Sequence, residues 1–136
     1  MFLPPKTILV SGPVIIKDGK VLLVKEHKET GPSPWFFPGG KVERFDEPLE
    51  EACRREAKEE IGIDIDILRP LRTLLIQRPE DPEKLVILLH YLALPLGEPN
   101  LGQDIIACEW LDIYQLPEDI APNVKIIIQE YIQEQK

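Results

Sequence analysis

Runs of aliphatic and β-branched residues alternate with turn-rich segments in the N-terminal part of the chain. Residues 8–16 and 21–25 are two such runs, and Asp18-Gly19-Lys20 between them is typical of a tight turn. The pattern predicts a β-hairpin. Residues 26–34 carry two prolines, a glycine and several charges, which predicts a surface loop, and Trp35-Phe36-Phe37 then returns to the composition of a strand.

A strongly helical pattern follows in residues 48–61. Pro48 suits the first turn of a helix, and Asp46 or Glu47 is placed to cap it. Gly62 is expected to end the helix, because glycine readily takes the left-handed conformation at that point.

The second half of the chain is richer in strand patterns than in helical ones. Strand composition recurs in three stretches, residues 63–77, 85–94 and 105–111. Residues 124–135 predict a second helix. Strands and helices are thus mixed without regular alternation, so the sequence predicts an α+β, or mixed α/β, fold in one domain over residues 1–136.

Composition and charge limit the classes of partner. The chain has 16 basic and 24 acidic side chains and a net charge of -8, which disfavours nucleic acid polymers and anionic membranes as partners. No apolar run approaches the ~20 residues of a membrane span, and residues 1–6 lack the apolar core of a signal peptide. We therefore expect a cytoplasmic protein, in which Cys53 and Cys108 are buried free thiols.

The helix over residues 48–61 places acidic side chains on its apolar face. At about 100° per residue, that face consists of Leu49, Ala52, Cys53 and Ala57. Glu56 and Glu60 lie in the middle of it, and Glu59 lies at its edge. A solvated glutamate run, the alternative, belongs on the opposite face, and burying an unpaired carboxylate costs several kcal/mol. Three carboxylates at this spacing therefore predict a site for a hard divalent cation.

The segment from Gly40 to Ile63 resembles the signature box of the Nudix hydrolases. Its second half, Arg-Glu-apolar-x-Glu-Glu-x-Gly-apolar, is matched at every position by residues 55–63, and Glu47 precedes Arg55 by the expected interval. Six residues rather than five separate Gly40 from Glu47, so either the loop carries an insertion or Asp46 takes the auxiliary role of that carboxylate. A P-loop is excluded, because Val42 rather than Ser or Thr follows the lysine after Gly40.

The resemblance implies a fold and an activity. The fold is an α/β/α sandwich with a mixed sheet between helices, as in small MutT-like or ADP-ribose pyrophosphatase-like members. The activity is hydrolysis of the diphosphate linkage in a nucleoside diphosphate derivative, with release of a nucleoside monophosphate and with Mg²⁺, or Mn²⁺, as cofactor. ADP-ribose and nucleoside triphosphates carry equal weight as substrates.

The resemblance also suggests roles for individual residues. Glu56 and Glu60 are implied as the primary metal ligands, with Glu59 as a third ligand or a base and the Gly40 carbonyl completing the shell. Arg55 is placed for orienting ion pairs with Glu51 and Glu59. Metal ions suit this chemistry because they neutralise diphosphate oxygens and activate water.

The remaining roles fall outside the helix. Asp104, in the loop before the late strand, is the favoured general base, with Glu98 as the other acid of that loop. Candidates to stack on a nucleobase are Trp35, Phe36 and Tyr91. Candidates to meet phosphates are Lys41 and Arg78, together with Lys25, His27 and Lys28. His90 lies in a strand pattern and is interpreted as structural.

Two other classes of protein are compatible with parts of this pattern. A non-catalytic nucleotide-sensing domain on the same fold would be expected to lack an acidic ligand, and none is lost in residues 55–60. An acidic protein-interaction module would leave the carboxylates on the apolar face unexplained. The expected partner is a small-molecule nucleotide, and the sequence leaves a homodimer open as an alternative to a monomer.

Overall fold

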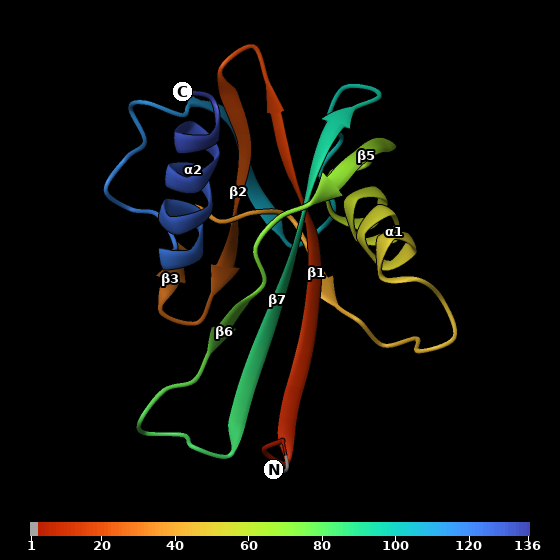
Figure 1. Ribbon diagram of the computed structural model, residues 1–136, viewed down its shortest axis with the longest axis vertical. Coiled ribbons are helices and arrows are strands. Elements are labelled where there is room, and N and C mark those ends of the chain that lie inside the picture. Colours follow the sequence, from red (N-terminus) through yellow and green to blue (C-terminus); the bar gives the residue numbers. More distant parts are fainter. Residues whose placement is uncertain (1–2) are drawn as a thin grey trace.

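The computed structural model describes residues 3–136 (Figure 1). Residues 1–2, the start of the segment examined for a signal peptide, lie outside that range. The elements are, in chain order, β1 (Lys6–Lys17), β2 (Lys20–Lys28), β3 (Gly31–Pro32), β4 (Gly40–Lys41), α1 (Leu49–Ile61), β5 (Ile65–Pro70), β6 (Leu74–Ile76), β7 (Lys84–Pro95), β8 (Ile105–Asp112) and α2 (Pro122–Glu134). No helix in residues 3–136 is long and apolar enough to cross a membrane.

The described strands form one mixed sheet. Its main order is β3-β2-β1-β7-β5, with β4 beside β1, β6 beside β7 and β8 beside β2. The pair β1 and β7 is parallel and extends from Lys6 opposite Lys84 to Ile15 opposite Ala93, whereas the other pairs are antiparallel. β1 is therefore a central strand, with β2, β4 and β7 as its hydrogen-bonded neighbours.

The predicted hairpin between β1 and β2 is confirmed. Asp18 and Gly19 both have positive φ, 53° and 75°, and Lys17 pairs with Lys20. Two consecutive positive φ angles match the right-handed twist of the flanking strands, which is why aspartate and glycine suit this turn.

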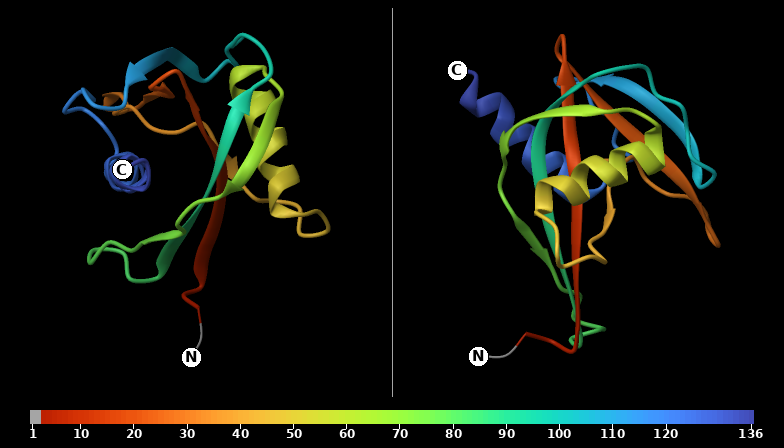
Figure 2. Two further views of the ribbon diagram at one scale, coloured as in Figure 1. Left: turned by 45° about the horizontal axis from the view of Figure 1, so that its top comes forward. Right: turned by 90° about the vertical axis from the view of Figure 1, so that its right-hand side faces the viewer.

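The two helices cover opposite faces of the sheet (Figure 2). Side chains of a strand alternate between faces, so Ile15 packs in a buried cluster with α1, whereas Val14 and Ile16 pack in a second cluster with α2. Burial of both faces explains the near-continuous aliphatic runs of β1 and β2. The predicted α+β sandwich, a mixed sheet between two helices, is confirmed.

Several local predictions are wrong in their boundaries. Residues 26–34 are not a plain loop, because β2 continues to Lys28 and pairs with β3. The expected strand at Trp35-Phe36-Phe37 makes only isolated bridges, from Phe36 to Val24 and from Trp35 to Ile120. The stretch 63–77 is divided into β5, which ends at Pro70, and β6, which begins at Leu74, although the Leu71 N–H still donates to the His90 carbonyl at 2.9 Å.

The start and the end of α1 differ in how well they were predicted. The N-terminal flank is Pro48 and has no side-chain cap, so the capping role predicted for Asp46 or Glu47 is wrong. Gly62 ends the helix as predicted, with φ 69° and its N–H donating to the Lys58 carbonyl. The Glu47 carboxylate pairs with Arg55 instead.

A close crossing of two backbone segments positions the loop that precedes α1. A Cβ on Gly12 of β1 would lie 2.1 Å from the Pro38 carbonyl oxygen and 2.9 Å from the Gly39 Cα. Only glycine at this position of β1 lets the Pro38-Gly39 backbone lie directly against the sheet. The crossing delivers Gly39 and Gly40 to the side of the sheet that carries α1.

Candidate active site

Glu56 and Glu60 of α1 lie where the helical wheel placed them. Glu56 is only 8% exposed and sits among the buried residues Ala52, Cys53 and Ala57 of the same helix. Glu60 is half-buried, and Glu59 is exposed. The apolar face of α1 therefore does carry two carboxylates into the protein.

The backbone of Gly39 and Gly40 lies directly against these two carboxylates. The Gly39 N–H donates a hydrogen bond to Oε2 of Glu60, with an N–O distance of 3.2 Å. A Cβ on Gly40 would lie 2.1 Å from Oε2 of Glu56. The Gly-Gly pair thus forms one wall of an acidic site whose other wall is α1.

The carboxylates of this site are held in an unfavourable environment for negative charge. Burial raises the pKa of Glu60 to about 7, and the neighbouring charges of Glu56, Glu26 and Glu59 add to that effect. Burial and the charge of Glu59 likewise raise the pKa of Glu56. The Gly39 hydrogen bond opposes the shift of Glu60 without cancelling it. A positive charge placed between these carboxylates would favour their ionised forms and lower their pKa values.

Arg55 lies at the rim of the site and connects three acids. Its guanidinium donates to Glu47 at 3.1 Å and to Glu56 at 3.0 Å, and it lies 3.9 Å from Glu59. The bond to Glu47 raises the pKa of Arg55, so the group stays charged. Its Nε atom is buried and has no hydrogen-bond partner within the described residues. Arg55 therefore orients Glu56 and holds the start of α1.

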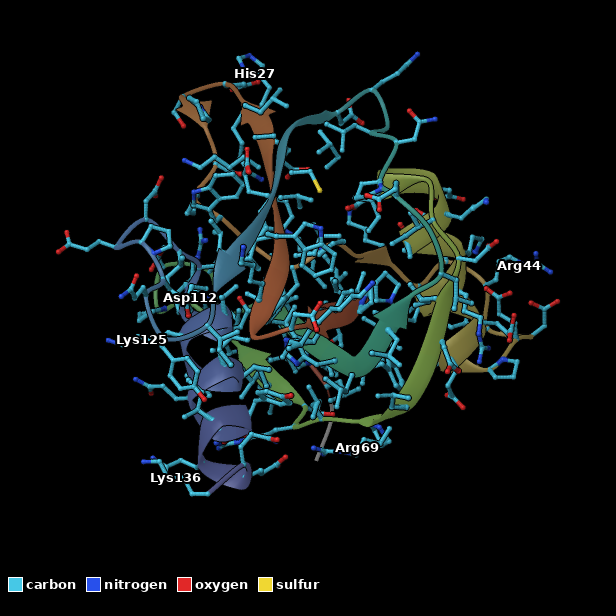
Figure 3. All side chains as sticks on the ribbon, turned by 90° about the horizontal axis from the view of Figure 1, so that it is seen from above. His27, Arg44, Arg69, Asp112, Lys125 and Lys136 are labelled. Atoms are coloured by element: carbon cyan, nitrogen blue, oxygen red, sulfur yellow. The ribbon has the colours of Figure 1, made fainter. Side chains whose placement is uncertain are left out.

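The predicted ion pair between Arg55 and Glu51 is wrong, because Glu51 pairs with Arg54 instead. The structure also shows which acid stands beside Arg55 in the loop before α1. Glu47 contacts Arg55, whereas Asp46 lies 3.6 Å from Arg44 and is exposed. Arg44 projects outward beside α1 in Figure 3. The extra residue between Gly40 and Glu47 is thus accommodated as an insertion in the loop.

The donor set fits a hard divalent cation. It comprises the carboxylates of Glu56, Glu59 and Glu60 and the carbonyl of Gly40, all of them oxygen ligands. Among residues 3–136 no three acidic, histidine or cysteine side chains already converge on one point suitable for a metal ion. Glu59 turns instead toward Arg55 and solvent, with 59% of its side chain exposed. A cation bound by all three glutamates would require Glu59 to rotate toward the other two.

The loop between β7 and β8 packs against the C-terminal end of α1. Asn100 N–H donates to the Ile61 carbonyl at 2.7 Å, and Gly102 N–H donates to the Glu60 carbonyl at 2.8 Å. Asp104 follows as an exposed residue directly before β8. Glu98 lies elsewhere, in a hollow of ≈ 280 Å³ at the β1–β2 turn with Lys17 and Lys20. Of the two loop acids, Asp104 is the one carried by the part of the loop that contacts α1.

The aromatic candidates separate into different environments. Phe36 lines a small cavity of ≈ 190 Å³ beside Gly39, together with Leu88, His90 and Asn123. Trp35 packs on the α2 side and has the Lys25 ammonium 5.1 Å from its ring centre. Tyr91 is a core residue, 8% exposed, whose hydroxyl donates to Glu50 at 3.4 Å. The structure thus contradicts a stacking role for Tyr91.

The basic candidates are scattered. Lys41 is exposed on β4, directly after Gly40, and stays beside the site. Arg78 lies in the β6–β7 loop, beside Glu80, Asp81 and Lys84. This loop lies away from α1, so the structure does not bring Arg78 to the acidic cluster (Figure 1). His27 projects away from α1 (Figure 3). Lys25 and Lys28 are paired with Asp119 at 2.6 Å and Glu26 at 2.9 Å, respectively, so no common basic rim forms.

The buried groups outside the acidic cluster serve the fold. His90 Nδ1 lies 2.9 Å from the Arg72 carbonyl oxygen and Nε2 lies 3.1 Å from the Asn123 amide, and burial lowers the pKa of His90. The structural interpretation of His90 is thus in keeping with its contacts. Both cysteines are free, as predicted, with Cys53 buried and Cys108 half-buried. Burial raises the pKa of Cys53 to about 12, which keeps its thiol protonated.

Glu26 is the acidic residue near the site that sequence reasoning missed. It was assigned to a loop, but it lies on β2, and its charge acts on Glu60. The signal was present in the alternation of β2, because Glu26 follows Leu22 and Val24, two residues of the α1-side cluster, at every second position.

The fold and the site together define a class of enzyme: an α/β/α hydrolase whose carboxylate helix faces a Gly-Gly backbone. The NUDIX domain family model matches residues 6–131, and the chain belongs to this family. It is therefore a Nudix pyrophosphohydrolase acting on phosphoanhydride bonds, a family that typically requires a divalent metal and takes nucleotide-type small molecules as substrates.

Known proteins of this family resemble the chain over most of its length. An ADP-ribose pyrophosphatase from Methanocaldococcus jannaschii is 34% identical over 128 residues, covering 93% of this chain and 73% of the relative. An oxidized purine nucleoside triphosphate hydrolase from Danio rerio is 29% identical, covering 76% of this chain and 65% of the relative. The crystal structure of a MutT NUDIX hydrolase from Burkholderia pseudomallei superposes with a TM-score of 0.80 at 27% identity, covering 91% of this chain and 97% of that chain.

Proposed function

We propose that this protein hydrolyses the diphosphate linkage of a nucleoside diphosphate derivative and releases a nucleoside monophosphate. The observation that carries the proposal is the pair of inward-facing carboxylates, Glu56 and Glu60, placed against the backbone of Gly39 and Gly40. Clustered acids with raised pKa values are costly to fold, and a functional site is where such a cost is retained. A diphosphate-bound cation gives these charges a partner.

Mg²⁺, or Mn²⁺, would be held by Glu56, Glu59 and Glu60 of α1 and by the Gly40 carbonyl of β4. When bound, the cation supplies charge neutralisation at the diphosphate oxygens and a lowered pKa for water. Arg55 keeps Glu56 in place through its hydrogen bond, and Glu47 in turn holds Arg55. The protein's own contribution is thus a fixed set of oxygen donors beside a backbone wall.

The nucleobase and the phosphates of the substrate would bind in different parts of the site. The cavity beside Gly39 is lined mainly by apolar and aromatic groups, Phe36 among them, with the Asn123 amide as a polar group. Such a lining suits a nucleobase, which needs a flat apolar surface and a few hydrogen-bond partners. Lys41 follows Gly40 directly and is placed to meet a phosphate. Trp35 remains a second candidate for stacking.

Asp104 is our proposed general base. Asp104 is exposed on a loop and is not among the proposed cation ligands, so its carboxylate stays free to accept a proton from water. Asp104→Asn should lower turnover by at least about a hundredfold, the usual contribution of a general base, and leave Mn²⁺ affinity unchanged. Glu98→Gln is the control, because Glu98 of the same loop lines the hollow shared with Lys17 and Lys20. If Glu59→Gln abolishes turnover with metal binding intact and Asp104→Asn does not, the base lies on the helix.

The relatives favour two substrate classes, since one is named an ADP-ribose pyrophosphatase and another an oxidized purine nucleoside triphosphate hydrolase. ADP-ribose, dNTPs, NADH, diadenosine polyphosphates and nucleotide sugars, each with Mg²⁺ or Mn²⁺, form the test panel. In ¹⁸O-water the label should enter a phosphate-containing product, with a nucleoside monophosphate among the products. Label found only in free sugar or base refutes the reaction class.

The metal site is tested through the same substrates. Glu56→Gln and Glu60→Gln should each reduce hydrolysis by at least about a hundredfold while the proteins stay folded by circular dichroism. Activity near wild type in both variants refutes the mechanism.

A further inference from the structure

Glu26 lies on β2, on the face of the sheet that α1 covers. Alternate residues of a strand share a face, and Leu22 and Val24 belong to the buried cluster on the α1 side. A register irregularity follows Lys25, but the extra residue is Ile106 of β8, so the alternation along β2 continues. Lys25 confirms this reading, because it contacts Trp35 on the opposite side. The Glu26 side chain therefore leaves the sheet toward α1.

The backbone of Glu26 is fixed by the segment that leads to Gly39. The Glu26 N–H donates to Oγ of Ser33 at 3.0 Å, and the Ser33 N–H donates to the Glu26 carbonyl at 2.9 Å. Ser33 itself is buried, at 3% exposure. The position of Glu26 is thus tied to the same chain segment whose Gly39 contacts Glu60.

The Glu26 carboxylate faces one cation and one anion. Its single ion pair among the described residues is with Lys28, at 2.9 Å, and the lysine is more than half exposed. On the other side it is near enough to Glu60 for its charge to act on that group. Glu60 has no basic partner in residues 3–136, and the Gly39 N–H is its hydrogen-bond donor. A carboxylate held by one exposed lysine is free to exchange that partner for a metal ion.

We propose that Glu26 is a further ligand of the divalent cation, supplied by the sheet and facing the three glutamates of α1. The inference rests on the proposed function, because it takes Glu56, Glu59 and Glu60 as the metal site. It gives the site a ligand from an element other than α1, so that the bound cation links helix and sheet. Lys28 then competes with the cation for Glu26.

Mn²⁺ binding, measured by isothermal titration calorimetry without substrate, tests this ligand. Glu26→Gln and Glu26→Asp should each weaken Mn²⁺ binding by about tenfold or more, the usual effect of disturbing a metal site. The aspartate keeps the charge but shortens the side chain, so it separates a direct ligand from a nearby charge. Glu29→Gln, an exposed acid of the following turn, is the matched control and should bind like wild type.

Salt and Lys28 supply the second part of the test. Wild-type affinity in Glu26→Asp, or a Glu26→Gln defect that disappears in 0.5 M KCl, where the Debye length is only a few ångströms, overturns the proposal, because a long-range charge is then sufficient. Lys28→Gln should strengthen Mn²⁺ binding, and unchanged affinity counts against the exchange of partners. Unchanged binding in Glu56→Gln and Glu60→Gln would instead refute the α1 metal site, so the two failures are distinguishable.

Discussion

Gly40 sets how close the loop backbone can come to the carboxylates of α1. Its missing side chain leaves the space that Oε2 of Glu56 occupies, since a Cβ would lie 2.1 Å from that atom. Gly97, in contrast, has only the Ile63 Cγ2 within 4.0 Å of an added Cβ. The two glycines therefore differ in whether a methyl group fits, which makes them a matched pair.

Gly40→Ala should displace Glu56 and reduce both Mn²⁺ affinity and kcat/KM by about tenfold or more, as expected when a ligand is moved from its position. Gly97→Ala should leave both values unchanged. Titration calorimetry and steady-state kinetics measure the two effects. Equal behaviour of the two variants would mean that Gly40 does not define the site.

Glu60 gives the metal-free protein a pH-dependent stability. Its pKa is about 7 in the folded protein and returns to the ordinary 4.5 on unfolding, so the folded state binds the proton more tightly. This contribution is fully present below pH 4.5 and is lost as the pH rises through about 7. In EDTA, the urea midpoint should therefore fall from pH 5 to pH 8, and Glu60→Gln should flatten that fall. If the urea midpoints of Glu60→Gln and wild type change with pH to the same extent, Glu60 is not the source of the pH dependence.

Single residues also show where sequence reasoning succeeded and where it did not. Glu56 and Glu60 could be predicted because helical periodicity alone puts them on the apolar face. Glu26 was missed because its strand was taken to end at Lys25, although the alternation of Leu22 and Val24 continues to it, and the pairing with Ile105 that extends β2 leaves no mark in the local sequence. Tyr91 and Arg78 were misplaced because a residue type suggests chemistry but not location.

At the scale of elements, the end of α1 depends on contact with the β7–β8 loop. Gly62 turns the chain away with φ 69°, and the Asn100 and Gly102 N–H groups satisfy the free carbonyls of Ile61 and Glu60. The sequence predicted Gly62 correctly, since a C-terminal glycine is a local signal. The loop contacts could not be predicted, because they join segments that no local pattern links.

Gly102→Ala should loosen this contact, since its Cβ would lie 2.7 Å from the Glu59 carbonyl oxygen. Overpacking of this kind costs about 1–3 kcal/mol of unfolding free energy. Urea denaturation should show the loss, and turnover should fall as well if Asp104 moves with the loop. The Gly97→Ala variant again serves as control, and equal urea midpoints for both would show that the loop yields without cost.

At the scale of the whole molecule, one sheet carries two buried clusters, one under each helix. The α+β class was predictable from the order of elements, whereas the mixed sheet between helices was implied by the resemblance to the Nudix family. The strand order was not predictable, because the pairing of β1 with β7 leaves no mark on either strand alone. A single domain over residues 1–136 remains our prediction, and size-exclusion chromatography will separate a monomer from the homodimer left open.

The two tryptophans test the single domain directly, because Trp110 packs on the α1-side cluster and Trp35 on the α2-side cluster. A single cooperative unit unfolds all at once. Urea transitions followed by fluorescence in Trp35→Phe and in Trp110→Phe should each match the far-UV circular dichroism transition of the same variant. Fluorescence and circular dichroism midpoints that differ within one variant would indicate two units.

The parallel pairing of β1 with β7 has a consequence for how the chain is made. Lys6 pairs with Lys84 and Ile15 with Ala93, so the edge of β1 that faces β7 has no partner until β5, β6 and β7 have been synthesised. Pairing between such distant segments is slow, because the intervening chain must first lose conformational entropy. Until then the aliphatic strand is open to contact with chaperones or with other nascent chains. We expect the yield of folded protein to depend more on translation rate and chaperone supply than the small size of the chain suggests.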